Sequence, residues 1–316
     1  MGIILALMAT LLHIALCFAI APFMWGLIVT LRARIQGQPG PSVRQPYRHL
    51  ARLLGKAALV PDTATEFFTV WPLVAFVAFA VAVMLIPGFC TGMLTASAGD
   101  YLTVIGLFAL GRAAMMLGGQ ETGSAFGGAS GARLAFSGLY ADATLLVLVL
   151  TFALLRQGTA SLNGMALAFG ELHAGGFVAM GFALAAMVVV AFTEAGYRPA
   201  GQQELAMSWD SMALEYSGRL LALLDYADML RRLAWMNLII CIFIPFGMAR
   251  AGAVLSWPGG LLFWGLKLLC LVTGVAVLTA IRAETRLSRL PEALSVALFL
   301  GLVASLFLVV MVRASS

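Results

Sequence analysis

Long apolar runs separated by polar segments dominate the sequence. A helix needs about 20 apolar residues to cross a bilayer core about 30 Å thick. The strand-like alternation that is typical of a membrane barrel is absent. The pattern therefore predicts an all-α polytopic membrane protein with about eight transmembrane helices in one integral membrane domain, residues 1–316. The eight runs are Ile3–Thr30, Phe67–Phe89, Tyr101–Leu117, Phe136–Leu155, Leu172–Phe192, Leu233–Met248, Gly259–Ile281 and Ala293–Val312.

The composition excludes a water-soluble globular protein. Apolar residues make up 62% of the 316 residues and charged residues 10%, whereas soluble domains average about 45–50% and about 25%. The net charge of +5 would suggest a nucleic-acid partner in a soluble protein. Here the basic excess of cytoplasmic loops explains it, and no basic and aromatic patch indicates nucleic-acid binding.

The distribution of basic residues predicts the orientation. With the N-terminus outside, the outer loops hold only Arg156, Arg250 and Arg313. The inner loops hold fourteen basic residues: Arg32, Arg34, Arg44, Arg48, Arg52, Lys56, Arg133, Arg198, Arg219, Arg231, Arg232, Arg282, Arg286 and Arg289. By the positive-inside rule we expect a multi-pass protein of the bacterial inner membrane with both termini in the periplasm. The first run has its positive charge after it, unlike a signal peptide, and is expected to remain as a helix.

Three long polar segments fall on the predicted inner side. They cover about residues 32–66, 118–135 and 193–232. Polar mass on one side of a membrane indicates a cytoplasmic partner or an ion entrance. The chain has no convincing internal repeat, which argues against a secondary transporter.

The first inner segment predicts a basic amphipathic helix. After Pro46 a helical period sets Tyr47, Leu50, Leu53 and Leu54 against Arg48, Arg52 and Lys56. Such a helix lies at a membrane surface, as an anchor on anionic lipid or as a docking site for a partner subunit. The residues proposed for docking are Arg44, Arg48 and Arg52, together with Glu121 and Arg133 of the second segment.

The second inner segment is rich in glycine and serine and reads GGQETGSAFGGASGAR. Its Gly127 and Gly128 resemble a phosphate-binding loop, but no strand precedes them, which argues against a nucleotide site. We expect a flexible turn that lets another part of the backbone approach closely.

The third inner segment predicts an amphipathic helix from about Gln202 to Tyr216. Its polar stripe lies beside its apolar stripe, so the acids lie at the margin of the buried face. Carboxylates there are harder to ionise, and several close together titrate as a coupled group. This suits proton relay; alternatively, the acids are solvated and pair with Arg198, Arg219, Arg231 and Arg232. The apolar stripe is Leu205, Trp209, Met212 and Tyr216, and the polar stripe is Glu204, Ser208, Ser211 and Glu215.

Ionisable residues inside the apolar runs are further candidates, because burying each costs at least about 2.5 kcal/mol. Asp142 and Lys267 are the strongest, either as relay residues or as a structural ion pair. Arg112 lies close enough to the end of its run to reach the membrane surface. His13 lies in the middle of its run, and a hydrogen bond to a helix backbone or between helices would explain it.

No metal or redox centre is predicted in this chain. The cysteines are far apart in sequence and include no C-x-x-C pair. The histidines are scattered, so they offer no paired ligands for haem or zinc. The residues concerned are Cys17, Cys90, Cys241, Cys270, His13, His49 and His173.

The chain resembles a known family in three segments: GQPGPSVRQPYRHLARLL, ETGSAFGGASGAR and ELAMSWDSMALEYSGRLLALLDYAD. The family is the membrane subunit of formate hydrogenlyase and hydrogenase-4 type complexes, related to subunit 1 of respiratory complex I. The resemblance covers nearly the whole chain, and the ETGSxFGG and LEYSG stretches are typical of the hydrogenase branch.

The resemblance implies a helical anchor that connects a peripheral arm to antiporter-like membrane subunits. The arm would consist of hydrogenase large and small subunits and an iron–sulfur subunit, which carry iron–sulfur clusters and a NiFe centre. In this family the acids of the third inner loop line a charged passage beneath the arm. Acids fall at the matching positions Glu204, Asp210, Glu215 and Asp225.

The chain departs from the family pattern at several positions. Before Glu204 the family tends to carry an Asp and a His, while this chain has Tyr197, Arg198, Pro199 and Gln202. Asp210 and Asp225 stand where that pattern has glutamate, which keeps the charge and shortens the reach. The acid that follows the arginine of the glycine-rich segment is replaced by Leu134, and Asp142 supplies a carboxylate further along.

We therefore expect a non-redox membrane subunit of an oxidoreductase complex. It would dock the peripheral arm and relay protons or conformational strain. Two alternatives remain: a stand-alone proton or cation carrier that uses Asp142 and Lys267, and a passive membrane anchor. The relay candidates are Glu204, Asp210, Glu215, Asp225, Asp142 and Lys267.

Overall fold

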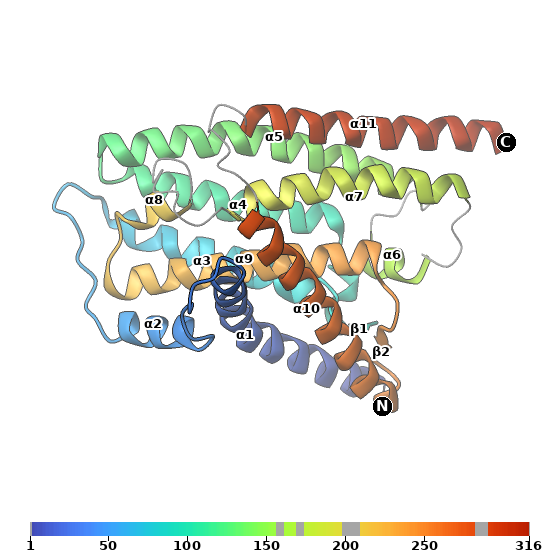
Figure 1. Cartoon of the computed structure of the whole chain (residues 1–316), viewed down its shortest axis with the longest axis horizontal. Coiled ribbons are helices and arrows are strands. Elements are labelled where there is room, and N and C mark those ends of the chain that lie inside the picture. The colour runs from blue at the N-terminus through green and yellow to red at the C-terminus, as the bar shows by residue number, and fades with distance from the viewer. Residues whose placement is uncertain (1, 156–160, 169–173, 198–208, 282–289, 316) are drawn as a thin grey trace.

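The protein is described by a computed structural model that covers residues 2–155, 161–168, 174–197, 209–281 and 290–315. Helices make up most of it (Figure 1). The long helices are α1 (Gly2–Ile35), α3 (Val70–Leu85), α4 (Tyr101–Gln120), α5 (Ala125–Leu155), α7 (Ala174–Glu194), α9 (Gly218–Phe243), α10 (Trp257–Ile281) and α11 (Leu290–Ser315). The short elements are α2 (Gln45–Leu54), α6 (Leu162–Ala168), α8 (Trp209–Ala213), the 3₁₀ turns η1 (Glu66–Thr69), η2 (Leu94–Ser97) and η5 (Val254–Ser256), and the strands β1 (Cys90–Thr91) and β2 (Ala249–Arg250).

Seven helices within the described residues are long and apolar enough to cross a membrane. They confirm seven of the eight predicted spans and the all-α polytopic architecture. The spans are Gly2–Ile35, Glu66–Leu85, Tyr101–Gln120, Ala125–Leu154, Gly176–Glu194, Val254–Ile281 and Pro291–Val310.

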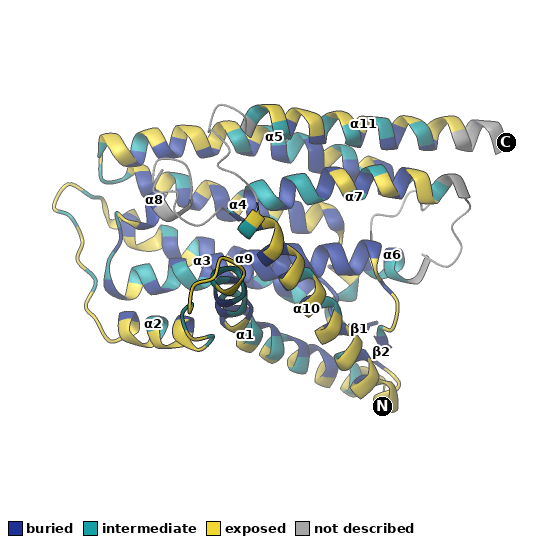
Figure 2. Cartoon of the chain, viewed as in Figure 1, coloured by how far each residue is buried: buried dark blue, intermediate teal, exposed yellow. Residues whose placement is uncertain are grey.

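The eighth predicted span, Leu233–Met248, is wrong in its boundaries. The structure has one helix, α9, from Gly218 to Phe243, and the charged residues from Arg219 to Arg232 that were assigned to an inner loop lie within it. All residues from 227 to 243 are buried (Figure 2). The helices α1, α2 and α3 pack against α9. Because protein surrounds this helix, it tolerates charges that a lipid-facing span would exclude.

The glycine-rich segment forms the expected turn only at residues 121–124, and the rest of it is helical, as the end of α4 and the start of α5. Helix α5 begins at Ala125, and the preceding Ser124 caps it, since its Oγ accepts a hydrogen bond from Gly127 N at 2.9 Å. The expected close approach of backbones is nevertheless present. A Cβ on Gly127 would lie 2.0 Å from the carbonyl oxygen of Gly119 in α4.

The two ends of the bundle differ in character. Figure 1 shows α2, α8 and the connection from α4 to α5 at one end, while the start of α1 and the end of α11 point toward the other. At that other end β1 pairs in parallel with β2, and Leu162 N donates to Gly99 O at 3.0 Å. The three polar segments therefore lie together, as predicted; the side of the membrane that they face remains a prediction.

The buried His13 forms the predicted contact with another helix. Its Nε2 lies 3.0 Å from the carbonyl oxygen of Ile86, just after α3. Trp264 of α10 donates to Asn237 Oδ1 of α9 at 3.0 Å. This bond lies close to His13, because a Cβ added to Gly88 would touch both His13 and Trp264. These bonds join α1, α3, α9 and α10.

Adjacent glycines in α5 provide a test of the close packing of α4 and α5. Gly127→Ala should lower the thermal unfolding midpoint of the purified protein, because its Cβ would overlap Gly119 O. Gly128→Ala should leave the midpoint unchanged or slightly higher, since no atom lies within 4 Å of its Cβ. Equal midpoints for the two variants would contradict this packing.

Candidate functional site: a buried network of charges

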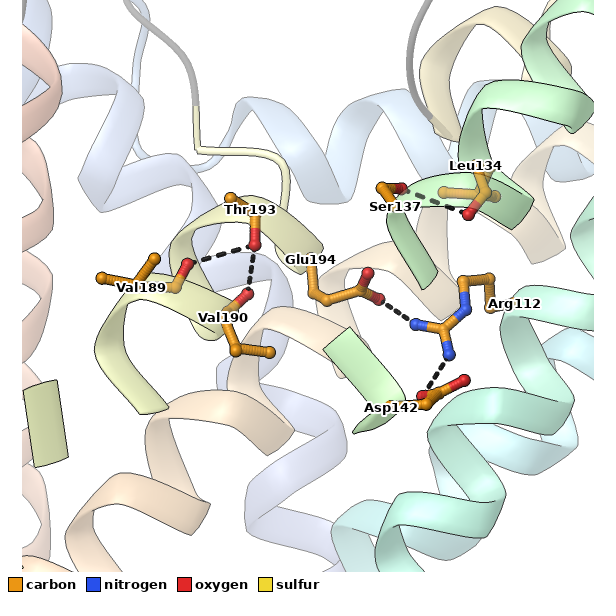
Figure 3. Close-up of polar contacts among 8 residues, drawn as sticks. All are labelled: Arg112, Leu134, Ser137, Asp142, Val189, Val190, Thr193 and Glu194. Atoms are coloured by element: carbon orange, nitrogen blue, oxygen red, sulfur yellow. Dashed lines mark hydrogen bonds and ion pairs between the residues drawn. The ribbon is translucent and has the colours of Figure 1, made fainter. Parts of the chain in front are cut away.

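Arg112 is the centre of a buried ion-pair cluster, which we call the Arg112 cluster (Arg112, Asp142 and Glu194). The guanidinium of Arg112 in α4 donates to Glu194 Oε2 of α7 at 2.6 Å and to Asp142 Oδ1 of α5 (Figure 3). Arg112 and Glu194 are almost fully buried, while Asp142 retains 33% of its side-chain exposure. Arg112 therefore does not reach the membrane surface as expected, because it is held by two carboxylates.

Gly138 of α5 leaves room for the Arg112 side chain because it has no side chain of its own. A Cβ on Gly138 would lie 2.5 Å from Arg112 Nε and 2.9 Å from its guanidinium carbon. Any larger residue would displace the guanidinium. Gly138 therefore permits the bridge between α4, α5 and α7.

A second cluster lies on α9, the Asp228 cluster (Asp228, Arg231 and Arg232). Asp228 accepts hydrogen bonds from Arg231 at 2.5 Å and from Arg232 at 2.6 Å, and all three side chains are buried. Arg232 also donates through Nε to the carbonyl oxygen of Ala195 at 3.0 Å. Its guanidinium lies 3.6 Å from the centre of the Trp25 ring in α1, within cation–π range.

The two clusters have complementary charge. The Arg112 cluster combines one guanidinium with two carboxylates, and the Asp228 cluster combines two guanidinium groups with one carboxylate. When every group is ionised, their formal charges are −1 and +1. Consecutive residues join them, since Glu194 belongs to the first and Ala195 accepts from the second.

Acids on the three polar segments connect these segments to one another. Glu121 at the end of α4 accepts from the Thr65 hydroxyl at 2.6 Å and from Trp71 Nε1 at 3.1 Å. Glu215 after α8 accepts from the Ser124 hydroxyl at 2.6 Å. The hydrogen bonds from Thr65 and then Trp71 lower the pKa of Glu121, so it is ionised at neutral pH.

Tyr216 lies beside these acids. Its ring stacks on Phe68 with centroids 4.2 Å apart, and a Cβ on Gly118 would meet its hydroxyl. Burial, followed by the negative charges of Glu121 and Glu215, raises the pKa of this phenol. Its Oη is buried and has no hydrogen-bond partner among the described residues. Tyr216 is therefore a neutral phenol within electrostatic range of two carboxylates, and its hydroxyl is a hydrogen-bond donor that holds its proton tightly.

The predicted amphipathic helix is present as α2, and it packs against α9 and α1. Pro46 and Leu53 are buried, whereas the predicted apolar positions Tyr47 and Leu54 are exposed. His49 Nε2 lies 3.0 Å from Asp225 Oδ2 of α9, and Arg219 Nε donates to Leu54 O at 3.3 Å. The docking candidates Arg44, Arg48, Arg52 and Arg133 have exposed side chains, as docking requires.

Several predicted relay residues have defined positions. Asp142 and Asp225 form the ion pairs described above, and Glu215 contacts Ser124. Met212 and Tyr216 of the predicted apolar stripe are buried, but so is Ser211 of the polar stripe, and α8 ends at Ala213. Glu204 and the side chain of Asp210 lie outside the described residues.

Lys267 belongs to a different part of the molecule, which corrects the idea of an Asp142–Lys267 ion pair. Its Nζ donates to the carbonyl oxygens of Ile244, at 2.7 Å, and Phe246. These carbonyls follow the C-terminus of α9, where a positive charge is favourable. Asp142 instead pairs with Arg112, so the two residues serve separate contacts.

The buried clusters include residues that sequence reasoning assigned to loops. Glu194, Asp228, Arg231 and Arg232 were expected in the third inner segment, and all four are buried. A signal was available on α9, since Asp228, Arg231 and Arg232 have the i, i+3, i+4 spacing of helical ion pairs. The pairing of Arg112 with Glu194 carries no local signal, because 82 residues separate them.

The described residues contain no group of three or more His, Cys, Asp or Glu side chains placed to hold a metal ion. Their polar chemistry consists of alternating carboxylates, guanidinium groups and hydroxyls. The candidate site is therefore a set of buried and half-buried charged side chains held by ion pairs and hydrogen bonds.

Removal of Arg112 tests the energetic role of the first cluster. Arg112→Gln should destabilise the protein by about 3–5 kcal/mol, because Glu194 would be left buried without its cation. Arg133→Gln, which removes an exposed arginine of α5, serves as the control and should have little effect. The measurement is the thermal unfolding midpoint; an unchanged midpoint for Arg112→Gln would contradict the assignment.

Comparisons with known proteins agree with this architecture. The chain is 27% identical over 262 residues to "Formate hydrogenlyase subunit 4" of Escherichia coli (strain K12), which covers 83% of this chain and 84% of that one. It is 29% identical over 260 residues to "Hydrogenase-4 component C" of the same organism, with 82% and 77% covered.

A solved chain of the membrane-bound sulfane sulfur reductase, an archaeal respiratory membrane complex, has the same fold. Its TM-score is 0.76 at 17% sequence identity, covering 96% of this chain and 100% of that chain. The family described as NADH dehydrogenase matches residues 7–312. These matches confirm the resemblance found in the three polar segments, and the chain belongs to the NADH dehydrogenase family.

Proposed function

We propose that this protein is the membrane-anchoring and proton- or ion-coupling subunit of a membrane-bound hydrogenase of the formate hydrogenlyase or hydrogenase-4 type, or of a related complex I-like oxidoreductase. One observation carries the proposal: the bundle buries ion pairs among α4, α5, α7 and α9, and acids at its polar end are held by hydrogen bonds between the polar segments. The relatives named above support the type of complex.

The surface of the polar segments suits a soluble partner. The arginines of α2 and α5 are exposed, while the acids Glu121 and Glu215 are held by hydrogen bonds between segments. A partner that covers this surface would exclude water and strengthen every electrostatic interaction beneath it. Docking would thereby change the proton affinity of the acids, which is what a coupling subunit requires.

The buried clusters argue against a passive anchor. Their ionised groups are costly to bury, and an apolar core of similar volume is often as stable or more stable. Retention of six charged groups inside the bundle therefore favours a role in moving charge. The stand-alone carrier has less support, because Asp142 and Lys267 belong to separate contacts.

The proposal includes partners and a location. Hydrogenase large and small subunits and an iron–sulfur subunit would cover the polar segments and carry the iron–sulfur clusters and NiFe centre. Antiporter-like membrane subunits would contact the exposed apolar helices. The protein would lie in a bacterial inner membrane with both termini in the periplasm, as the basic residues of the loops predict.

Purification of the native complex through a tag on this chain tests the partners. We expect a hydrogenase and iron–sulfur subunits to be recovered with it in fixed ratio, identified by mass spectrometry. The combined substitutions Arg48→Glu and Arg52→Glu should reduce their recovery, because both residues are exposed on α2. Recovery of the chain without any redox partner would refute the proposal.

Neutralisation of Glu215 tests coupling separately from assembly. Glu215→Gln keeps an acceptor for the Ser124 hydroxyl but cannot carry a proton, so proton translocation per catalytic turnover should fall by about 100-fold or more. Glu66→Gln changes an exposed acid of η1 and serves as the control. Translocation is measured in vesicles that hold the intact complex. Normal translocation by a correctly assembled Glu215→Gln complex would favour the passive anchor.

A further inference from the structure

Helix α1 contains a point where its own backbone bonding is interrupted. Pro22 lies inside the helix and has no N–H group, so the carbonyl oxygen of Phe18 loses its usual partner. The proline ring also crowds this turn. In a lipid environment, such carbonyls must be satisfied by other groups of the protein.

Two tyrosines from other helices satisfy this turn. Tyr226 of α9 donates its hydroxyl to Phe18 O at 2.9 Å, and Tyr47 of α2 donates to the next carbonyl, Ala19 O. The Tyr226 ring also packs edge-on against the Phe18 ring, with centroids 5.8 Å apart. The interrupted turn is therefore held by hydroxyl groups from two other helices, α2 and α9.

The same two helices carry the docking and relay candidates. Tyr47 precedes the exposed Arg48 on α2, and Tyr226 follows Asp225 on α9. The contact of His49 with Asp225, at 3.0 Å, joins α2 to α9 beside them. A displacement of α2 would consequently act on both tyrosine contacts with α1.

The part of α1 beyond Pro22 contacts the Asp228 cluster. Trp25 lies one turn further along and stacks on the guanidinium of Arg232 at 3.6 Å. Next to it is a pocket of about 190 Å³ between α1, α2 and α9. Trp25, Val29, His49 and Met229 are among its lining residues. At the edge of this pocket α1 is in close contact with the segment before α2, since a Cβ on Gly26 would lie 2.2 Å from Val43 O and the Thr30 hydroxyl donates to Pro41 O at 2.9 Å. A displacement of α2 therefore acts on this part of α1.

We propose that Tyr47 and Tyr226 are positioning residues that set the conformation of α1 at Pro22 and transmit a displacement of α2, through Trp25, to Arg232. The inference rests on the proposed function, because it supplies the mechanical step between docking of a partner on α2 and the buried charges. A shift of Trp25 changes the cation–π stabilisation of Arg232, and thereby the strength of the ion pair between Arg232 and Asp228. No covalent step is involved.

A double-mutant cycle tests the physical part of the inference on the purified chain. Pro22→Ala restores an N–H to bond Phe18 O, so the hydroxyl of Tyr226 is no longer needed there. We expect Tyr226→Phe to lower the unfolding midpoint when Pro22 is present and to have little effect together with Pro22→Ala. An equal effect of Tyr226→Phe in both backgrounds would overturn the inference.

Coupling in the intact complex tests the functional part. Tyr47→Phe and Tyr226→Phe should each reduce proton translocation per turnover several-fold while hydrogenase turnover and subunit recovery remain normal. Tyr140→Phe on α5, whose ring packs against Phe136, is the matched control and should behave as the unmodified protein. A merely structural role would alter recovery or turnover without changing this ratio, and that result would overturn the inference.

The outcome is distinguishable from failure of the proposed function. If Glu215→Gln abolishes translocation but both tyrosine variants translocate normally, the tyrosine inference is wrong and the coupling function stands. If the chain is recovered without redox partners, the proposed function fails and the coupling role of the tyrosines fails with it. The double-mutant cycle then still decides whether the tyrosines satisfy the turn at Pro22.

Discussion

The cost of burying charge away from water is the constraint on which the rest of this structure depends. Helix α9 brings Asp228, Arg231 and Arg232 into the interior, where each ionised group must find a partner. Local spacing supplies part of the answer, since Asp228 faces both arginines on the same helix. Neighbouring elements supply the rest through Ala195 O and the Trp25 ring. The packing of α1 and α7 around α9 follows from this requirement.

Charge complementarity extends this constraint from α9 to α4, α5 and α7. Counted over the described residues, the Arg112 cluster and the Asp228 cluster carry opposite formal charges, and the consecutive residues Glu194 and Ala195 at the end of α7 join them. A displacement at the end of α7 therefore acts on both clusters.

Hydrogen bonds between the polar segments fix the arrangement of these segments at one end of the bundle. Hydrogen bonds from Thr65 to Glu121 and from Ser124 to Glu215 join residues that lie far apart in sequence. At the opposite end, the pairing of β1 with β2 ties the loops together. The bundle is thus held at both ends, and at the interrupted turn of α1 the hydroxyls of Tyr47 and Tyr226 take part in this.

The sequence by itself determined the membrane character, seven of the spans and the grouping of the polar segments. Apolar runs and basic loops are local properties of the sequence, and the bilayer favours the first in its core and the second outside it. The sequence also identified Glu215, Asp225 and Asp142 as acids of interest. Only the tertiary structure decided their partners: Arg112 pairs with Asp142 and Glu194, and His49 with Asp225. The predicted span at Leu233 failed for the same reason. Hydropathy assigns charged residues to water, whereas neighbouring helices and opposite charges stabilise those of α9 inside the protein.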